Sequence, residues 1–132
     1  MNRSRKPPWS FARVVKASAT LSPTVKLIWL EHYGLANGAD GVATIGAGGL
    51  GRRLGLSRAT VERVRAYLLR VGLLGKRDRG VGRTAGWFPI LPARCRPQGT
   101  RLTDDDAQRY AELLDTMLGP EVPEQIPTSI MP

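Results

Sequence analysis

The fold is decided by residues 50–74, LGRRLGLSRATVERVRAYLLRVGLL. Gly55 can adopt a positive φ without steric cost, so it can end one helix and redirect the chain. Ser57 stands where its hydroxyl can cap the helix that follows. That helix has four apolar residues on one face, at i, i+3, i+7 and i+10: Val61, Val64, Leu68 and Val71. The stretch therefore predicts two short helices joined by a tight turn, with the second helix over 58–71.

Charge is unevenly distributed along this chain of 132 residues, whose net charge is +9. Residues 52–83 contain ten Lys/Arg against two acids, a local charge of +8, whereas residues 104–132 contain seven acids against Arg109, a local charge of −6. Positive charge concentrated in one compact segment indicates a polyanionic partner. Nucleic acid is favoured over a membrane surface, because the apolar face of the arginine-rich helix is needed for the core.

The flanking segments complete a mainly α fold with a small β-hairpin. Residues 1–8 are predicted to be a flexible basic arm, and the next few residues, from Trp9 to Val15, a short extended segment. Ser22 and Pro23 predict a helix start, with the helix running to about Ala36. A short strand is expected at 42–45, and a hairpin with strands at 73–78 and 87–91. The fold class is thus a winged helix-turn-helix domain over 9–92, a linker over 93–102, a C-terminal helix over 103–119 and a disordered tail over 120–132.

A helix that enters the major groove reads bases with side chains from its first two turns. The candidates for base contact here are Arg58, Ala59, Thr60, Glu62 and Arg63. Arg58 and Arg63 could each donate two hydrogen bonds to guanine, and a methyl group of Ala59 or Thr60 could contact thymine. Glu62 could accept from cytosine or hold a neighbouring arginine. The alternative for the whole set is an ordinary solvated helix face.

Backbone contacts are expected from residues around this helix and from the hairpin tip at 76–83, KRDRGVGR. The candidates are Arg52, Arg53, Ser57, Lys76, Arg77, Arg79 and Arg83. The tip could lie along phosphates or enter the minor groove. The C-terminal helix has an apolar stripe that could be satellite core or, as we favour, the seam of a homodimer: Ala107, Tyr110, Ala111, Leu114, Met117 and Leu118.

Other kinds of site find little support. Residues 46–51, GAGGLG, match a dinucleotide-binding fingerprint, but Gly55 interrupts the following helix too early for that fold. His32 lies within an apolar helix, where a structural or surface role is the simpler interpretation. Cys95 is the single cysteine, which favours a reducing cytoplasm. No apolar run reaches the length of a membrane span. We therefore expect no enzyme, no cofactor and no metal ion.

Residues 21–91 resemble winged helix-turn-helix proteins of bacteria, plasmids and phages. The resemblance rests on LSPTVKLIWLEHYG (21–34), GLSRATVERVRAYLLRVGLL (55–74) and GKRDRGVGRTAGWF (75–88). It implies a cytoplasmic protein associated with the nucleoid or a plasmid that binds double-stranded DNA, either as a small transcriptional regulator, such as a repressor, or as a replication or partition protein. Arg65 departs from the aliphatic residue usual in the pattern, which predicts a rotated or less firmly packed recognition helix.

Overall fold

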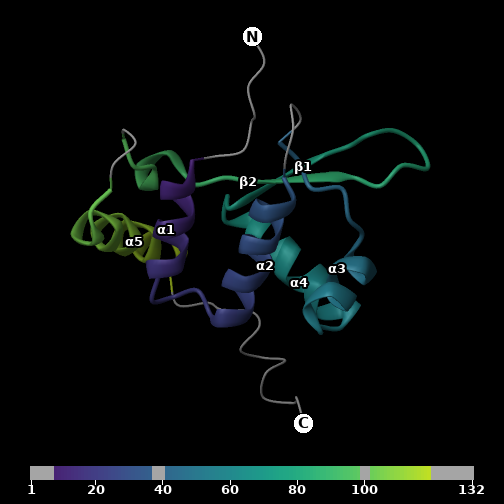
Figure 1. Cartoon of the computed structure of the whole chain (residues 1–132), viewed down its shortest axis with the longest axis horizontal. Helices are drawn as coiled ribbons and strands as arrows, with labels where there is room; N and C mark the ends of the chain where they lie inside the picture. The colour runs from purple at the N-terminus through teal and green to yellow at the C-terminus, as the bar shows by residue number, and fades with distance from the viewer. Residues whose placement is uncertain (1–7, 37–40, 99–101, 120–132) are drawn as a thin grey trace.

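Helix α2 (Pro23–Leu35) lies at the centre of the molecule (Figure 1). The computed structural model describes residues 8–36, 41–98 and 102–119. As the sequence predicts, the Ser22 side chain accepts a hydrogen bond from the Val25 N–H, and Pro23 occupies the first helical position. The helix buries Ile28 and Trp29, and the indole N–H of Trp29 donates to the Leu73 carbonyl at 2.8 Å. This bond ties α2 to the chain leaving the helix-turn-helix.

The predicted helix-turn-helix is confirmed as α3 (Ala47–Leu54) followed by α4 (Arg58–Arg70). Gly55 ends α3 with a φ of 72°, and the Ser57 side chain accepts from the Thr60 N–H at 3.0 Å. The turn is tight because Gly51 has no side chain: a Cβ there would lie 2.5 Å from the Leu56 carbonyl oxygen. This close approach explains why a glycine, and no larger residue, stands at position 51 of the segment 46–51.

The wing is a two-stranded antiparallel hairpin made by β1 (Leu74–Arg77) and β2 (Gly86–Pro89). Both strands are shorter than predicted. Pro89 pairs with Leu74 at the end of the ladder, where its missing N–H costs least. The strand predicted at 42–45 reduces to the bridge residues Val42 and Ala43, of which Ala43 pairs with Trp87. Helix-turn-helix and hairpin together form the expected winged helix-turn-helix arrangement.

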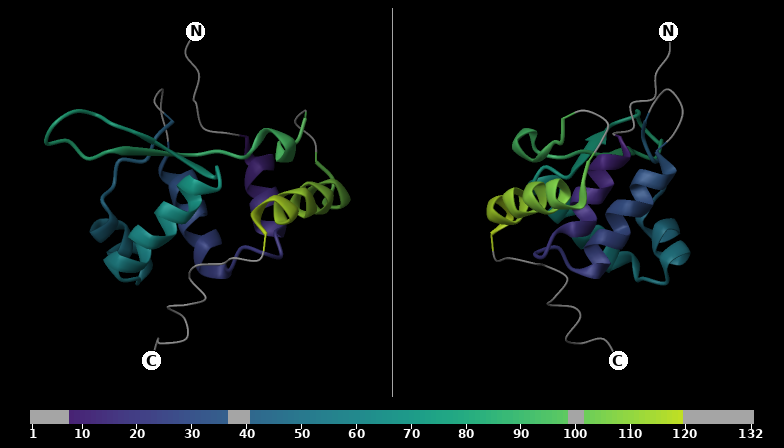
Figure 2. Two further views of the ribbon diagram at one scale, coloured as in Figure 1. Left: turned by 180° about the vertical axis from the view of Figure 1, so that it is seen from behind. Right: turned by 60° about the vertical axis from the view of Figure 1, so that its left-hand side comes forward.

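The extended segment predicted after the arm is wrong, because residues 9–17 form helix α1 (Trp9–Ala17). Its buried face consists of Ser10, Ala12, Val14 and Val15. Helix α1 packs against α5 (Asp104–Leu118), whose start is capped by the Thr103 side chain as predicted. The views in Figure 1 and Figure 2 agree that α1 and α5 lie at one end of the molecule and that α3, α4 and the wing lie at the other.

Most of the residues predicted to form a dimer seam on α5 pack inside the chain, the satellite-core alternative for this stripe. The buried members are Ala107, Ala111, Leu114 and Leu118, whereas Tyr110 is half-buried and Met117 is 47% exposed. Four of the six residues therefore cannot meet a second copy while α5 stays docked.

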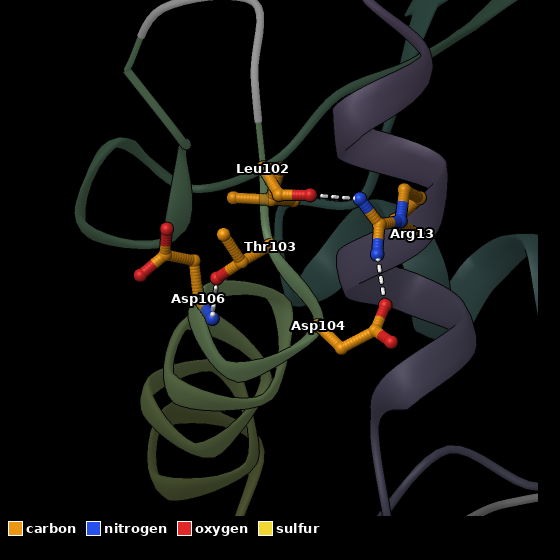
Figure 3. A network of polar contacts seen from close by, with 5 residues as sticks. All are labelled: Arg13, Leu102, Thr103, Asp104 and Asp106. Atoms are coloured by element: carbon orange, nitrogen blue, oxygen red, sulfur yellow. Dashed lines mark hydrogen bonds and ion pairs between the residues drawn. The ribbon is translucent and has the colours of Figure 1, made fainter.

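Polar bonds hold α5 in place at both ends. The Arg13 guanidinium donates to the Leu102 carbonyl and, at 2.5 Å, to Asp104 (Figure 3). At the other end, Asp115 accepts from the Ser18 hydroxyl at 2.5 Å and from the backbone N–H groups of Ala19 and Thr20. Helix α5 is therefore part of the same core as α1.

The predicted linker at 93–102 is not a free connection, because part of it packs against α5. It contains a short 3-10 helix, η1 (Ala93–Cys95), and buries Cys95 and Pro97. The predictions for residues 1–7 and 120–132 lie outside the described residues.

Candidate nucleic-acid interface

The first two turns of α4 present their polar side chains away from the core. Val61 and Val64 are fully buried, whereas Arg58, Ala59 and Arg63 are exposed. This split follows from the helical period: the residues between the core positions point outward. The face predicted to contact bases is therefore available to a ligand, apart from Thr60, which is half-buried.

The polar groups on this face differ in how they are engaged. The Arg58 Nε donates to Glu62 at 3.1 Å, so Glu62 holds a neighbouring arginine, one of the two roles expected for it. The Thr60 hydroxyl accepts from the Ser57 hydroxyl at 2.9 Å, which leaves its methyl group as the part free for contact. The Arg63 side chain makes no hydrogen bond or ion pair with any described residue. It is the guanidinium on this face that is most available for a bidentate contact.

The residues predicted to contact the backbone near α3 are not equivalent. Both Arg53 Nε and Nη2 donate to the same Glu31 oxygen, at 2.9 and 2.7 Å. Glu31 belongs to α2, so Arg53 is directed toward the body of the protein. Arg52 is exposed. Of the two, Arg52 is the better candidate for a phosphate, and Arg53 would have to exchange its carboxylate partner.

The wing carries the remaining cations on a tight glycine turn. Gly80 and Gly82 have φ values of 106° and 77°, a conformation that side-chain-bearing residues rarely adopt. Val81 between them is fully exposed at the tip. The cations lie along the strands and the turn: Lys76, Arg77 and Arg83 are exposed and Arg79 is half-buried. The wing and the α3–α4 unit lie at the same end of the molecule (Figures 1 and 2).

A buried arginine on the core side of α4 is the main feature that sequence reasoning missed. Arg65 is only 4% exposed. Its Nε donates to His32 Nε2 at 2.9 Å, its Nη2 donates to the Ile45 carbonyl at 2.7 Å, and its guanidinium lies 4.6 Å from the centre of the Trp87 ring. The expectation of a less firmly packed helix is wrong, because Arg65 joins α4 to α2, to the 42–46 segment and to β2. A rotated helix stays a prediction.

The protonation state of His32 follows from its partners. Its Nδ1 lies 2.7 Å from the Ile28 carbonyl and must donate to it, so Nε2 is the acceptor for Arg65. Burial and the Arg65 charge lower the pKa of His32 from 6.5 to about 4, although the bond to Ile28 acts in the opposite direction. Burial lowers the pKa of Arg65 to about 10, which leaves it charged at neutral pH. Neutral histidine and charged arginine are the compatible pair.

The described part of the chain offers little for sites of other kinds. Helix α3 has eight residues, and the sheet formed by the described strands is a two-stranded antiparallel hairpin, so the GAGGLG segment lacks the parallel sheet and crossover helix of a dinucleotide site. In residues 8–36, 41–98 and 102–119, no three His, Cys, Asp or Glu side chains are grouped to hold a metal ion. No described helix combines the length and apolarity needed to cross a membrane. Comparison with protein-family models, curated proteins and solved structures found no match for the chain.

Proposed function

We propose that this chain is a sequence-specific double-stranded-DNA-binding protein that acts in the bacterial cytoplasm as a small transcriptional regulator, most simply a repressor. Helix α4 enters the major groove, and the wing lies on the adjacent backbone or in the minor groove. No catalytic step is part of this function. The proposal is carried by one observation: the outward face of α4 exposes unshielded arginine beside a cationic wing at the same end of the molecule.

Base reading falls mainly to Arg63 and Arg58. Each can form two parallel hydrogen bonds with guanine O6 and N7, a contact worth about 1–3 kcal/mol of discrimination against another base. Arg63 is free to do so directly. Arg58 is oriented by Glu62, and this pair is exposed enough for the carboxylate to remain a support or to turn toward a cytosine amino group.

A homodimer remains part of the proposal, because one recognition helix covers few base pairs and two-fold symmetric binding doubles the site. The seam must now use the outward side of α5. Leu113 and Met117 are 44% and 47% exposed, and they are neighbours at i and i+4. Helix α5 lies at the end of the molecule opposite α4 (Figure 2), so pairing through it would favour half-sites that are well separated.

The decisive experiment is recovery of bound genomic DNA followed by affinity measurements on the recovered site and on a scrambled duplex. We expect Arg63→Ala to weaken cognate binding about 5- to 150-fold, the equivalent of the bidentate contact, and to leave scrambled binding nearly unchanged. Arg109→Ala, which removes an arginine from α5, is the matched control and should change neither.

Three outcomes contradict parts of the proposal. Equal loss on both duplexes would make Arg63 a backbone contact. Recovery of tandem repeats at a replication origin or centromere would identify a plasmid or phage replication or partition protein rather than a regulator. Wild-type protein that binds no duplex at low salt would refute DNA binding altogether.

A further inference from the structure

A groove of about 360 Å³ separates α4 from the hairpin. Arg65 and Lys76 line it together with Trp87, and Ala47, the first residue of α3, lies at its edge. The groove thus runs between the base-reading helix and the wing. Its lining includes two cations, Arg65 and Lys76, and one acid, Glu62.

The guanidinium of Arg65 has an unused donor in this groove. Nε and Nη2 are bonded to His32 and to the Ile45 carbonyl, whereas Nη1 bonds to no described residue. Nη1 is also not among the fully enclosed side-chain atoms without a hydrogen-bond partner, a group that includes Ser10 Oγ. Because Arg65 lines the groove, Nη1 is its donor that remains available to a ligand there.

The positive charge of Arg65 has no carboxylate partner among the described residues. Its acceptors are a neutral imidazole, a carbonyl and the face of Trp87, which compensate a buried cation only in part. An anion that enters the groove would supply the missing counter-charge. The acid lining this groove, Glu62, is already bonded to Arg58.

Two further features favour an anion at the same place. Lys76 is the cross-strand partner of Trp87, and its ammonium lies 5.3 Å from the centre of the Trp87 ring, so the indole holds both cations on one side of the hairpin. Helix α3 begins at Ala47 with no side-chain cap, which leaves its first N–H groups free and its positive dipole end unscreened.

We propose that this groove binds one phosphate of the DNA backbone, held between Arg65 Nη1 and Lys76 Nζ. The inference rests on the proposed function and adds a specific backbone contact to it. Free inorganic phosphate has the same chemistry, but the open groove between α4 and the wing suits a phosphate that arrives as part of a duplex. This contact fixes the register of α4 because Arg65 itself belongs to that helix.

The test is the salt dependence of duplex binding, measured from about 50 to about 200 mM KCl for wild type, Arg65→Met, Lys76→Met and the double variant. Because each neutralised phosphate contributes about 0.9 to the slope of log K against log[KCl], one shared phosphate predicts that the double variant loses about 0.9. Arg109→Ala should keep the wild-type slope. If the slope of the double variant falls by about 1.8, the two cations contact two separate phosphates. If binding weakens but the slope is unchanged, Arg65 only supports the fold. Either result overturns the proposal.

A second measurement uses the unaltered protein, in case Arg65→Met does not fold. The guanidinium NMR signals of Arg65 should shift when duplex saturates the protein, whereas inorganic phosphate at the same phosphate concentration should leave them near their free positions. Signals unmoved by duplex would overturn the proposal, and an equal response to inorganic phosphate would assign the groove to a free anion. Wild-type protein that fails to bind duplex at all would instead refute the proposed function.

Discussion

Replacing Asp115 with alanine should destabilise the whole molecule, although this residue lies far from the candidate interface. Its carboxylate accepts from the Ser18 hydroxyl at 2.5 Å, the Ala19 N–H at 2.9 Å and the Thr20 N–H at 3.1 Å. These bonds connect α5 to the turn between α1 and α2. Without them the turn loses its acceptor and α5 loses its polar attachment to the α1–α2 turn.

The magnitude follows from the number and exposure of these bonds. A hydrogen bond to a charged group contributes about 1.5–3 kcal/mol. In the variant, the Ala19 N–H can form a hydrogen bond with water because Ala19 is exposed. The Ser18 hydroxyl cannot, because Ser18 is buried. We therefore expect a loss of about 2–3 kcal/mol rather than the full sum. For a chain of this size, that corresponds to a melting temperature about 6–12 °C lower.

The assay is urea and thermal unfolding followed by circular dichroism. Glu112→Ala is the matched control. Glu112 is an exposed acid of the same helix, and its side chain bonds to no described residue. This variant should change the free energy of unfolding by about 0.5 kcal/mol or less. If Asp115→Ala and Glu112→Ala lose the same amount, the bonds of Asp115 do not contribute to holding α5, and the docking argument fails.

Three further predictions test other parts of the structure. Gly51→Ala should prevent stable folding, because its Cβ would lie 2.5 Å from a backbone oxygen. Gly48→Ala, whose Cβ would have no contact nearer than 3.8 Å, should raise the free energy of unfolding by about 0.5–1 kcal/mol. Equal effects of the two variants on the melting temperature would contradict this. The pKa of His32 is about 4 in the folded protein against 6.5 in the unfolded chain. Its contribution of about 3 kcal/mol to the free energy of unfolding is therefore present above pH 6.5 and is lost as the pH falls toward 4. This part of the pH dependence of stability should vanish in His32→Gln, and its persistence would be evidence against the assignment. The double variant Leu113→Glu/Met117→Glu should remain folded and sediment as a monomer; an unchanged dimer would exclude this side of α5 as the seam.

Local signals in the sequence were sufficient to predict most helix starts. The three caps Ser22, Ser57 and Thr103 each accept a backbone N–H as expected. Capping depends on residues within one turn, so it can be recognised without knowledge of the partner elements. The same holds for Gly55, whose positive φ ends α3.

Helix α1 could not be recognised in this way because its start lacks such a signal. Pro8 stands at the cap position and offers no side-chain acceptor. The helix is held instead by contacts from residues far along the chain, among them the bonds of Arg13 to Leu102 and Asp104. The apolar stripe of α5 left two interpretations open in the sequence, satellite core or dimer seam, and the contact with α1 accounts for most of its residues.

The buried pair of Arg65 and His32 did leave a trace in the sequence. Arg65 follows Val61 by four residues and precedes Leu68 by three, so the helical period places it on the core face. His32 is likewise a polar residue in an apolar helix. Each looked like an exception alone, but two polar residues directed into the same core are most simply explained as partners.

Trp87 is the residue through which the fold sets the geometry of the candidate interface. Its backbone exchanges hydrogen bonds with Ala43 at 2.7 and 2.9 Å. Its ring makes cation–π contacts with Arg65 from α4 and with Lys76 from β1. Within the free protein, Trp87 therefore ties the wing to Ala43 by backbone bonds and to α4 by its contact with Arg65. We accordingly expect DNA to meet a preformed surface, and substitutions at this junction to change the spacing between base and backbone contacts as well as stability.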